Sequence, residues 1–186
     1  MIGCRPLTDT EIDQLKVHPT LSTRDRVLLV VGALTGFRVG ELRTLQVQDI
    51  ALGKATVRRR NMKGKDRSRT ITLHPEALAA IEALVYEQKL GPTSYLFQSQ
   101  KGPNKPISAR HAHRVLSAAF KELGLEGKVA THSMRKYFAG QVYEKSGKDI
   151  ALTANMLGHR NVNSTLSYLS FQTETADALI LNMRRK

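Results

Sequence analysis

The 186-residue sequence lacks several features that mark common classes of protein. It has one cysteine, Cys4, so no disulfide can form within the chain. No Cys/His cluster has the spacing of a zinc site. No apolar run approaches the roughly 20 residues of a membrane span. The N-terminus has neither a signal-peptide core nor a glycine for myristoylation. These absences favour a reducing, cytoplasmic location.

Nucleotide and metal motifs are absent as well. The sequence contains no P-loop and no dinucleotide-binding fingerprint. No carboxylate cluster has a composition suited to magnesium. We therefore expect neither a cofactor nor a metal. Tryptophan is missing, but an apolar fraction of 41% is normal for a globular protein, and the length fits one domain over residues 1–186.

Positive charge is the most informative part of the composition. Lysine and arginine number 29 against 16 acidic residues, which gives a net charge of +13 and a pI near 10.2. A field of this sign attracts polyanions, and phosphate neutralisation releases counterions, so nucleic acid is the favoured partner. The alternative is a basic protein, ribosomal or otherwise, whose charge serves only solubility.

The sequence pattern is mainly helical. A capping box of Thr8 and Glu11 opens a helix to about Val17. The apolar run in 23–35 predicts a buried helix, and 38–46 a further amphipathic one. Residues 49–73 alternate as β-prone segments around a basic turn. Further helices are expected over 75–89, 108–122, 131–146, 149–157, 162–169 and 174–184. The predicted fold class is α+β, mainly α, with a small antiparallel sheet or hairpin.

Six polar residues stand out because of their chemistry and their order. They are Arg38, Lys63, His132, Arg135, His159 and Tyr168. Taken singly, each has an ordinary explanation as an ion-pair partner, a solvated charge, a helix cap or a core tyrosine with a polar tip. Their surrounding segments read TGFRVGELRTLQVQDI, NMKGKDRSRTITL, THSMRK and LGHRNVNSTLSYL.

Together these four segments resemble the catalytic domain of the tyrosine recombinases, the phage integrase family. The resemblance covers about residues 8–170. Its most specific parts are the first segment and the LGH motif with a tyrosine nine residues after its histidine. Lys63 is a weaker match because Lys65 lies two residues away, and Lys136 stands where a histidine is frequent in the family.

The resemblance implies cleavage and rejoining of DNA strands. Tyr168 would attack a phosphate and form a 3′-phosphotyrosyl bond, without metal or ATP. Arg38 and Arg135 would bind the non-bridging phosphoryl oxygens, as forked guanidinium donors do. Lys63 would protonate the leaving 5′ oxygen.

The remaining assignments by resemblance concern the histidines. His132 would accept the tyrosine proton or orient the hydroxyl, and His159 would donate to a phosphoryl oxygen. Glu41 matches the acidic position that supports the histidine of the second motif. Which histidine takes the proton stays open.

The resemblance also bears on domains and partners. The sequence leaves no room for an N-terminal core-binding domain, so the chain is either a piece of a longer integrase or a short form like the fimbrial phase-switch invertases. Residues 1–170 would form the catalytic core, and 171–186 a tail that exchanges between subunits or packs on its own core. The expected partners are double-stranded DNA, further copies in a tetramer on DNA, and accessory DNA-bending proteins; the free chain can be a monomer.

Further candidate DNA contacts are basic side chains of the expected turn, a loop and helix 108–122. They are Lys65, Arg67, Lys101, Lys105, Arg110 and Arg114. Their alternative is a solvated surface. Three rival functions remain: a DNA-binding regulator that has lost catalysis, a type IB topoisomerase and a basic RNA-binding protein. The intact set of six residues argues against the first.

Overall fold

A computed structural model describes residues 3–61 and 68–169 of the chain. Its helices are α1 (Asp9–Lys16), α2 (Thr23–Thr35), α3 (Val39–Leu42), α4 (Pro75–Glu87), α5 (Ala109–Glu122), α6 (His132–Lys145), α7 (Ile150–Leu157) and α8 (Asn163–Leu169). The strands are β1 (Ile50–Ala51), β2 (Lys54–Val57) and β3 (Arg69–Thr72), with short 3-10 turns at Val47–Asp49 and Arg59–Asn61. The mainly α class with a small antiparallel sheet is confirmed. None of the helices in these ranges is long and apolar enough to cross a membrane.

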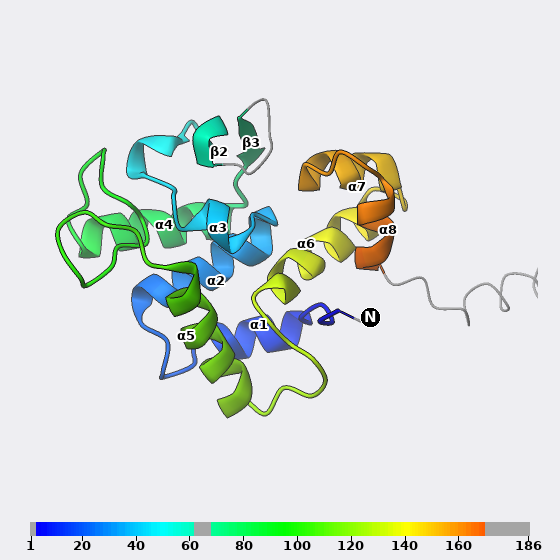
Figure 1. The fold of residues 1–186 in the computed structure, drawn as a ribbon, viewed down its shortest axis with the longest axis horizontal. Coiled ribbons are helices and arrows are strands. Elements are labelled where there is room, and N and C mark those ends of the chain that lie inside the picture. The colour runs from blue at the N-terminus through cyan, green and yellow to red at the C-terminus, as the bar shows by residue number, and fades with distance from the viewer. Residues whose placement is uncertain (1–2, 62–67, 170–186) are drawn as a thin grey trace, which may run out of the picture.

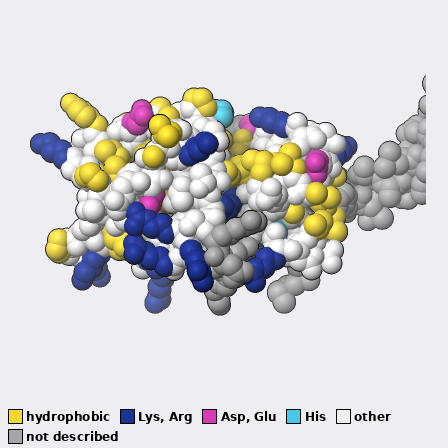
Figure 2. Space-filling view, turned by 90° about the horizontal axis from the view of Figure 1, so that it is seen from above, with side chains coloured by type: hydrophobic (Ala, Val, Ile, Leu, Met, Phe, Trp, Pro, Cys, Tyr) yellow, Lys and Arg dark blue, Asp and Glu magenta, His cyan; other side chains and the backbone are white. Residues whose placement is uncertain are grey.

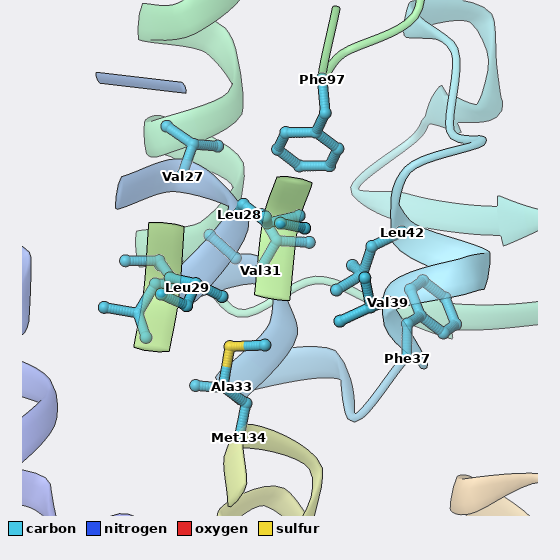
Figure 3. Packing of buried hydrophobic residues seen from close by; sticks show 14 of the residues in the cluster. Val27, Leu28, Leu29, Val31, Ala33, Phe37, Val39, Leu42, Phe97 and Met134 are labelled. Atoms are coloured by element: carbon cyan, nitrogen blue, oxygen red, sulfur yellow. The ribbon is translucent and has the colours of Figure 1, made fainter. Parts of the chain in front are cut away.

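Helix α2 lies at the centre of the domain and packs against α1, α4, α5 and α6 (Figure 1). Its run of buried aliphatic side chains meets Phe97 from a loop and Met134 from α6 (Figure 3). This confirms the burial predicted from the apolar run. The Met134 thioether packs tightly at Gly32, where a Cβ atom would lie only 3.0 Å from it. The core therefore fixes α6 closely against α2.

Local capping signals fix most helix starts. Thr8 and Glu11 form the predicted capping box, and the Ser22 and Ser108 side chains each accept from a backbone N–H one turn into their helix. Pro75 occupies the first turn of α4, as predicted. These helices begin within a residue or two of the positions that the sequence indicates.

One predicted helix is wrong in extent. We expect a helix over 38–46 from the sequence, but α3 ends at Leu42. Beyond it, the Leu45 carbonyl accepts from the Leu96 N–H, and the Val47 N–H donates to the Ser94 carbonyl. The chain therefore leaves the helix to pair with a segment some 50 residues away. Leu45 still reaches the core from this extended position.

The sheet has three antiparallel strands in the order β1-β2-β3. Ala55 pairs with Ile71, and Val57 pairs with Arg69. Ala55, Val57 and Ile71 are buried, so one face of the sheet covers the core. The basic turn predicted between β2 and β3 falls largely on residues 62–67, which lie outside the described residues, as does the predicted helix over 174–184.

Candidate active site

The turn after α2 places Arg38 at the start of α3. Gly36 ends α2 in the left-handed conformation (φ 60°), and a Cβ atom at this position would clash with the Phe138 ring. Arg38 then begins α3, and its backbone N–H donates to Glu41 Oε2 at 2.9 Å. Its guanidinium donates to Glu41 Oε1 at 3.0 Å and has a side-chain exposure of 38%. Arg38 is therefore held at its base while its guanidinium keeps access to solvent.

Arg135 lies deeper, on the first turns of α6, with only 1% of its surface exposed. Its Nη1 donates to the Gly36 carbonyl, and its Nη2 donates to the Leu157 carbonyl at 2.7 Å. Both carbonyls end helices, where the helix dipole favours a cation. Arg135 therefore connects two distant segments. One is the turn before Arg38, where Gly36 lies 99 residues from Arg135, and the other is the LGH motif, where Leu157 lies 22 residues from it.

A third buried arginine, Arg69 of β3, was missed by the sequence reasoning. Its Nη2 donates to the carbonyls of Thr35 and Met156, and its Nη1 lies 3.5 Å from Glu41 Oε2. The guanidinium also stacks over the Phe37 ring, 4.7 Å from the centroid. Burial, followed by the neighbouring charge of Arg135, lowers the pKa of Arg69 to about 10.

A signal for Arg69 is present in the sequence. In RTITL, positions 69, 71 and 73 alternate onto one strand face, and Ile71 and Leu73 are core residues. An arginine in that alternation faces inward and needs partners there. Glu41 provides the charge partner for both Arg38 and Arg69. Its support of His132, expected by resemblance, stays a prediction.

His132 is the first residue of α6 and is exposed, unlike Arg135 three residues later. Desolvation by the surrounding protein lowers the pKa of His132, and the charges of Arg135 and Arg38 lower it further. The ring is therefore biased toward its neutral form, which can accept a proton. His132 is therefore close enough to both arginines to respond to their charges.

The LGH motif ends α7 next to these arginines. Gly158 caps α7 in the left-handed conformation, and the His159 N–H donates to the Ala154 carbonyl at 2.9 Å. Gly158 lies against the Arg69 side chain, since a Cβ atom there would be 3.1 Å from Arg69 Cδ. His159 Nδ1 is 2.7 Å from the hydroxyl of Thr165 in α8. The motif, the buried arginines and α8 thus meet in one region.

The remaining catalytic candidates are placed only in part. Tyr168 lies on α8, a helix that contacts α6 and α7, but its side chain is outside the described residues. Lys63, Lys65 and Arg67 fall in residues 62–67, which are also outside the described residues. The structure therefore brings together Arg38, His132, Arg135 and the LGH motif, and their roles and that of Tyr168 stay predictions.

Further basic side chains are available at the surface. Lys101 and Lys105 are exposed in a loop, and Arg110 and Arg114 are exposed on α5. Arg59 and Arg60, beside the turn between β2 and β3, are also exposed. Figure 2 shows Lys and Arg side chains gathered along one edge of the face that it presents. Such clustering suits an extended polyanion better than a small ligand.

The fold and these motifs define the catalytic-domain class of the tyrosine recombinases. A crystal structure of XerA recombinase superposes with a TM-score of 0.80 at 25% identity, covering 100% of this chain and 66% of that one. The XerH recombinase, crystallised on its palindromic difH substrate in a post-cleavage complex, has the same fold (TM-score 0.74, 24% identity, 95% of this chain and 52% of that one).

The chain belongs to the phage integrase family, whose family model matches residues 6–174. It is 31% identical to the tyrosine recombinase XerA of Pyrococcus furiosus over 166 residues, 88% of this chain and 56% of that protein. It is also 31% identical to the probable integrase/recombinase YoeC of Bacillus subtilis over 155 residues, 83% of this chain and 82% of that protein. The chain thus spans little more than half the length of some curated relatives.

Proposed function

We propose that this chain cuts and rejoins double-stranded DNA at specific sites, with Tyr168 as the nucleophile. The observation that carries the proposal is the convergence of Arg38, His132 and Arg135 beside the LGH motif. Arg38, the α6 residues and the LGH motif come from three separate segments of the chain. A cluster of arginines beside a histidine whose pKa is lowered is suited to an anionic phosphodiester, whose transition state gathers charge on its non-bridging oxygens.

The two arginines contribute in different ways. Arg38 keeps its guanidinium accessible, so it contacts a phosphoryl oxygen directly. Both terminal nitrogens of Arg135 donate to backbone carbonyls, so the surrounding turns hold its guanidinium in a fixed orientation for the phosphoryl oxygens. Arg69 adds a further buried charge beside them. This arrangement stabilises negative charge with preorganised donors and needs no rearrangement at the moment of reaction.

The chemical step exchanges one phosphodiester bond for another. The Tyr168 oxygen attacks phosphorus, and the bond from phosphorus to the 5′ oxygen breaks. His132, biased toward the neutral form, accepts the tyrosine proton, and Lys63 supplies a proton to the leaving oxygen. His159 donates to a phosphoryl oxygen. Rejoining is the reverse attack by a 5′-hydroxyl of a partner strand, so the step consumes no nucleotide and needs no metal.

The assembly and setting follow from the same proposal. The protein acts in the cytoplasm on duplex DNA, as a tetramer of this chain or of a longer chain that contains it. Support comes from the net charge of +13 and from the DNA-bound XerH relative.

A covalent-adduct assay tests the proposal. The DNA site that the protein binds is first selected from a library of randomised duplexes. A nicked duplex that carries this site then traps the covalent protein–DNA intermediate. We expect a covalent protein–DNA band with the wild type and with Tyr86→Phe, an exposed tyrosine of α4. Tyr168→Phe should lose the band and keep DNA binding. A band that persists in Tyr168→Phe refutes the nucleophile, and no band from the wild type favours the regulator.

A relaxation assay separates the remaining alternative. A type IB topoisomerase relaxes supercoiled plasmid as a monomer, without a selected site. We expect no relaxation of a plasmid that lacks the selected site. Site-independent relaxation at monomer concentrations would replace the recombinase proposal with the topoisomerase.

A further inference from the structure

His159 connects helices α7 and α8, through its backbone N–H to α7 and through its ring to α8. Its backbone N–H is bonded to the end of α7, and its Nδ1 contacts the Thr165 hydroxyl at 2.7 Å. Thr165 lies on α8, three residues before Tyr168, and none of its surface is exposed. The family resemblance assigns a role to His159 and none to Thr165.

We propose that Thr165 is a positioning residue that sets the tautomer of His159 and so keeps a proton on Nε2. A buried hydroxyl must place its proton on an acceptor, because a buried donor left unsatisfied costs about 1–3 kcal/mol. Among residues 3–61 and 68–169, the Thr165 hydroxyl has one hydrogen-bond partner, which is His159. The hydroxyl therefore donates to Nδ1.

The tautomer follows from that direction. Nδ1 of a neutral imidazole accepts a hydrogen bond only when the ring proton is on Nε2. With the opposite tautomer, Nδ1–H would donate to the Thr165 oxygen, and the hydroxyl proton would then have no acceptor among residues 3–61 and 68–169. With the proton on Nε2, the outer edge of the ring is a donor, which suits a phosphoryl oxygen. The reverse tautomer would present a lone pair to an anion.

The position of Thr165 adds a link to the nucleophile. Because Thr165 and Tyr168 share the short helix α8, the helix that carries the nucleophile also sets the tautomer of the phosphate-binding histidine. Displacement of α8 would therefore move the Tyr168 nucleophile away and release the tautomer of His159 at the same time. This inference rests on the proposed function only for the roles of Tyr168 and His159, since the tautomer itself is a property of the free protein.

Thr153 provides a matched control. It is a fully buried threonine in the neighbouring α7, and its hydroxyl donates to the Asp149 carbonyl at 2.7 Å. Thr153→Val and Thr165→Val therefore make the same change in the same region. Only Thr165→Val removes a hydrogen bond to His159. Thr165→Ser restores the hydroxyl and tests whether the effect depends on that bond.

The first measurement is the nitrogen NMR spectrum of the protein labelled with ¹⁵N-histidine, recorded without DNA. Signals of His159 are identified by their loss in His159→Gln. We expect the Nε2–H tautomer in the wild type, in Thr153→Val and in Thr165→Ser, and a mixture of tautomers in Thr165→Val. An Nδ1–H tautomer in the wild type, or an unchanged tautomer in Thr165→Val, overturns the proposal.

The second measurement is the rate of covalent-adduct formation on the nicked duplex. Loss of one oriented donor to a developing oxyanion costs 10²–10³ in rate. Partial loss of the correct tautomer should slow Thr165→Val by about tenfold to a hundredfold with unchanged DNA affinity. Thr165→Ser should recover most of the rate. Equal rates for Thr165→Val and the wild type refute the positioning role, whereas a wild type without adduct refutes the proposed function and leaves the NMR result standing.

Discussion

Arg69 shows how one buried charge can hold a site together. Its guanidinium bonds to carbonyls at the ends of α2 and α7, and it approaches Glu41. Removing one member of a buried charge network costs about 3–5 kcal/mol, since the other members lose their partner. Arg69 therefore links the Arg38 turn with the LGH motif.

We expect Arg69→Met to lower the free energy of unfolding by about 3 kcal/mol, measured by urea denaturation. The thioether fills part of the space but leaves the Thr35 and Met156 carbonyls without that donor. Arg60→Met, at an exposed arginine beside the sheet, should change stability by less than about 0.5 kcal/mol. Equal stability of the Arg69 variant and the wild type would show that the arginine is not structural.

His132 gives a pH prediction. Its neutral form is the proton acceptor, so adduct formation should rise with pH and level off once the ring is neutral. Desolvation by the surrounding protein and the charges of Arg135 and Arg38 lower the pKa of His132 from its usual 6.5, so the plateau should extend below pH 6.5.

The rate of adduct formation between pH 4.5 and 8 tests this. Arg38→Gln removes one of the charges that lower the pKa of His132, so the midpoint in this variant should move toward higher pH, at a reduced plateau rate. A wild-type midpoint above pH 7 would contradict the assignment of His132 as acceptor.

At the scale of elements, the turn between α2 and α3 depends on Gly36. Its φ of 60° is strained for other residues, and Phe138 occupies the space that a side chain would need. Gly36→Ala should therefore destabilise the domain by more than the roughly 1–2 kcal/mol of the backbone strain alone.

Gly40, four residues after Gly36, should tolerate the substitution to alanine that Gly36 does not. It lies within α3, and a Cβ atom there would have nothing within 4 Å. Gly40→Ala should leave stability unchanged or raise it by about 0.4–1 kcal/mol. Thermal unfolding of both variants measures the contrast. Similar losses in the two would show that the turn does not need its glycine.

The helices and strands also show which structural features depend only on residues nearby in the sequence. Helix starts follow from nearby residues, such as Thr8 with Glu11 and the proline at position 75, so the sequence predicts them well. The early end of α3 could not be predicted in this way, because Leu45 leaves the helix to pair with Leu96. That pairing depends on residues about 50 positions away.

The same distinction between local and long-range features applies to the residues of the site. The resemblance identifies Arg38, His132 and Arg135, and the structure joins their segments through the bond from Arg135 to the Gly36 carbonyl. It gives no hint of Thr165 or Arg69, whose importance lies in partners brought together only by folding. Alternation in β3 marks Arg69 as inward-facing, but its carbonyl partners in α2 and α7 are invisible in the sequence.

At the scale of the whole molecule, the charge of +13 predicts strongly salt-dependent DNA binding. Each phosphate neutralised by a basic side chain releases counterions, and the logarithm of the affinity falls with the logarithm of the salt concentration. Arg110 and Arg114 are exposed on α5 and are candidates for such contacts. Each substitution to alanine should reduce the slope by about one.

Lys16 is the control that separates local contact from total charge. Lys16→Ala removes the same formal charge, but Lys16 already forms ion pairs with Asp13 and Glu76. Its charge is locally balanced, so it should neutralise no phosphate and leave the slope unchanged. Fluorescence anisotropy on one duplex from 50 to 300 mM salt gives the slopes of the wild type and the three variants. If Lys16→Ala reduces the slope as much as Arg110→Ala does, the protein responds to DNA through its net charge, and α5 is not a contact surface.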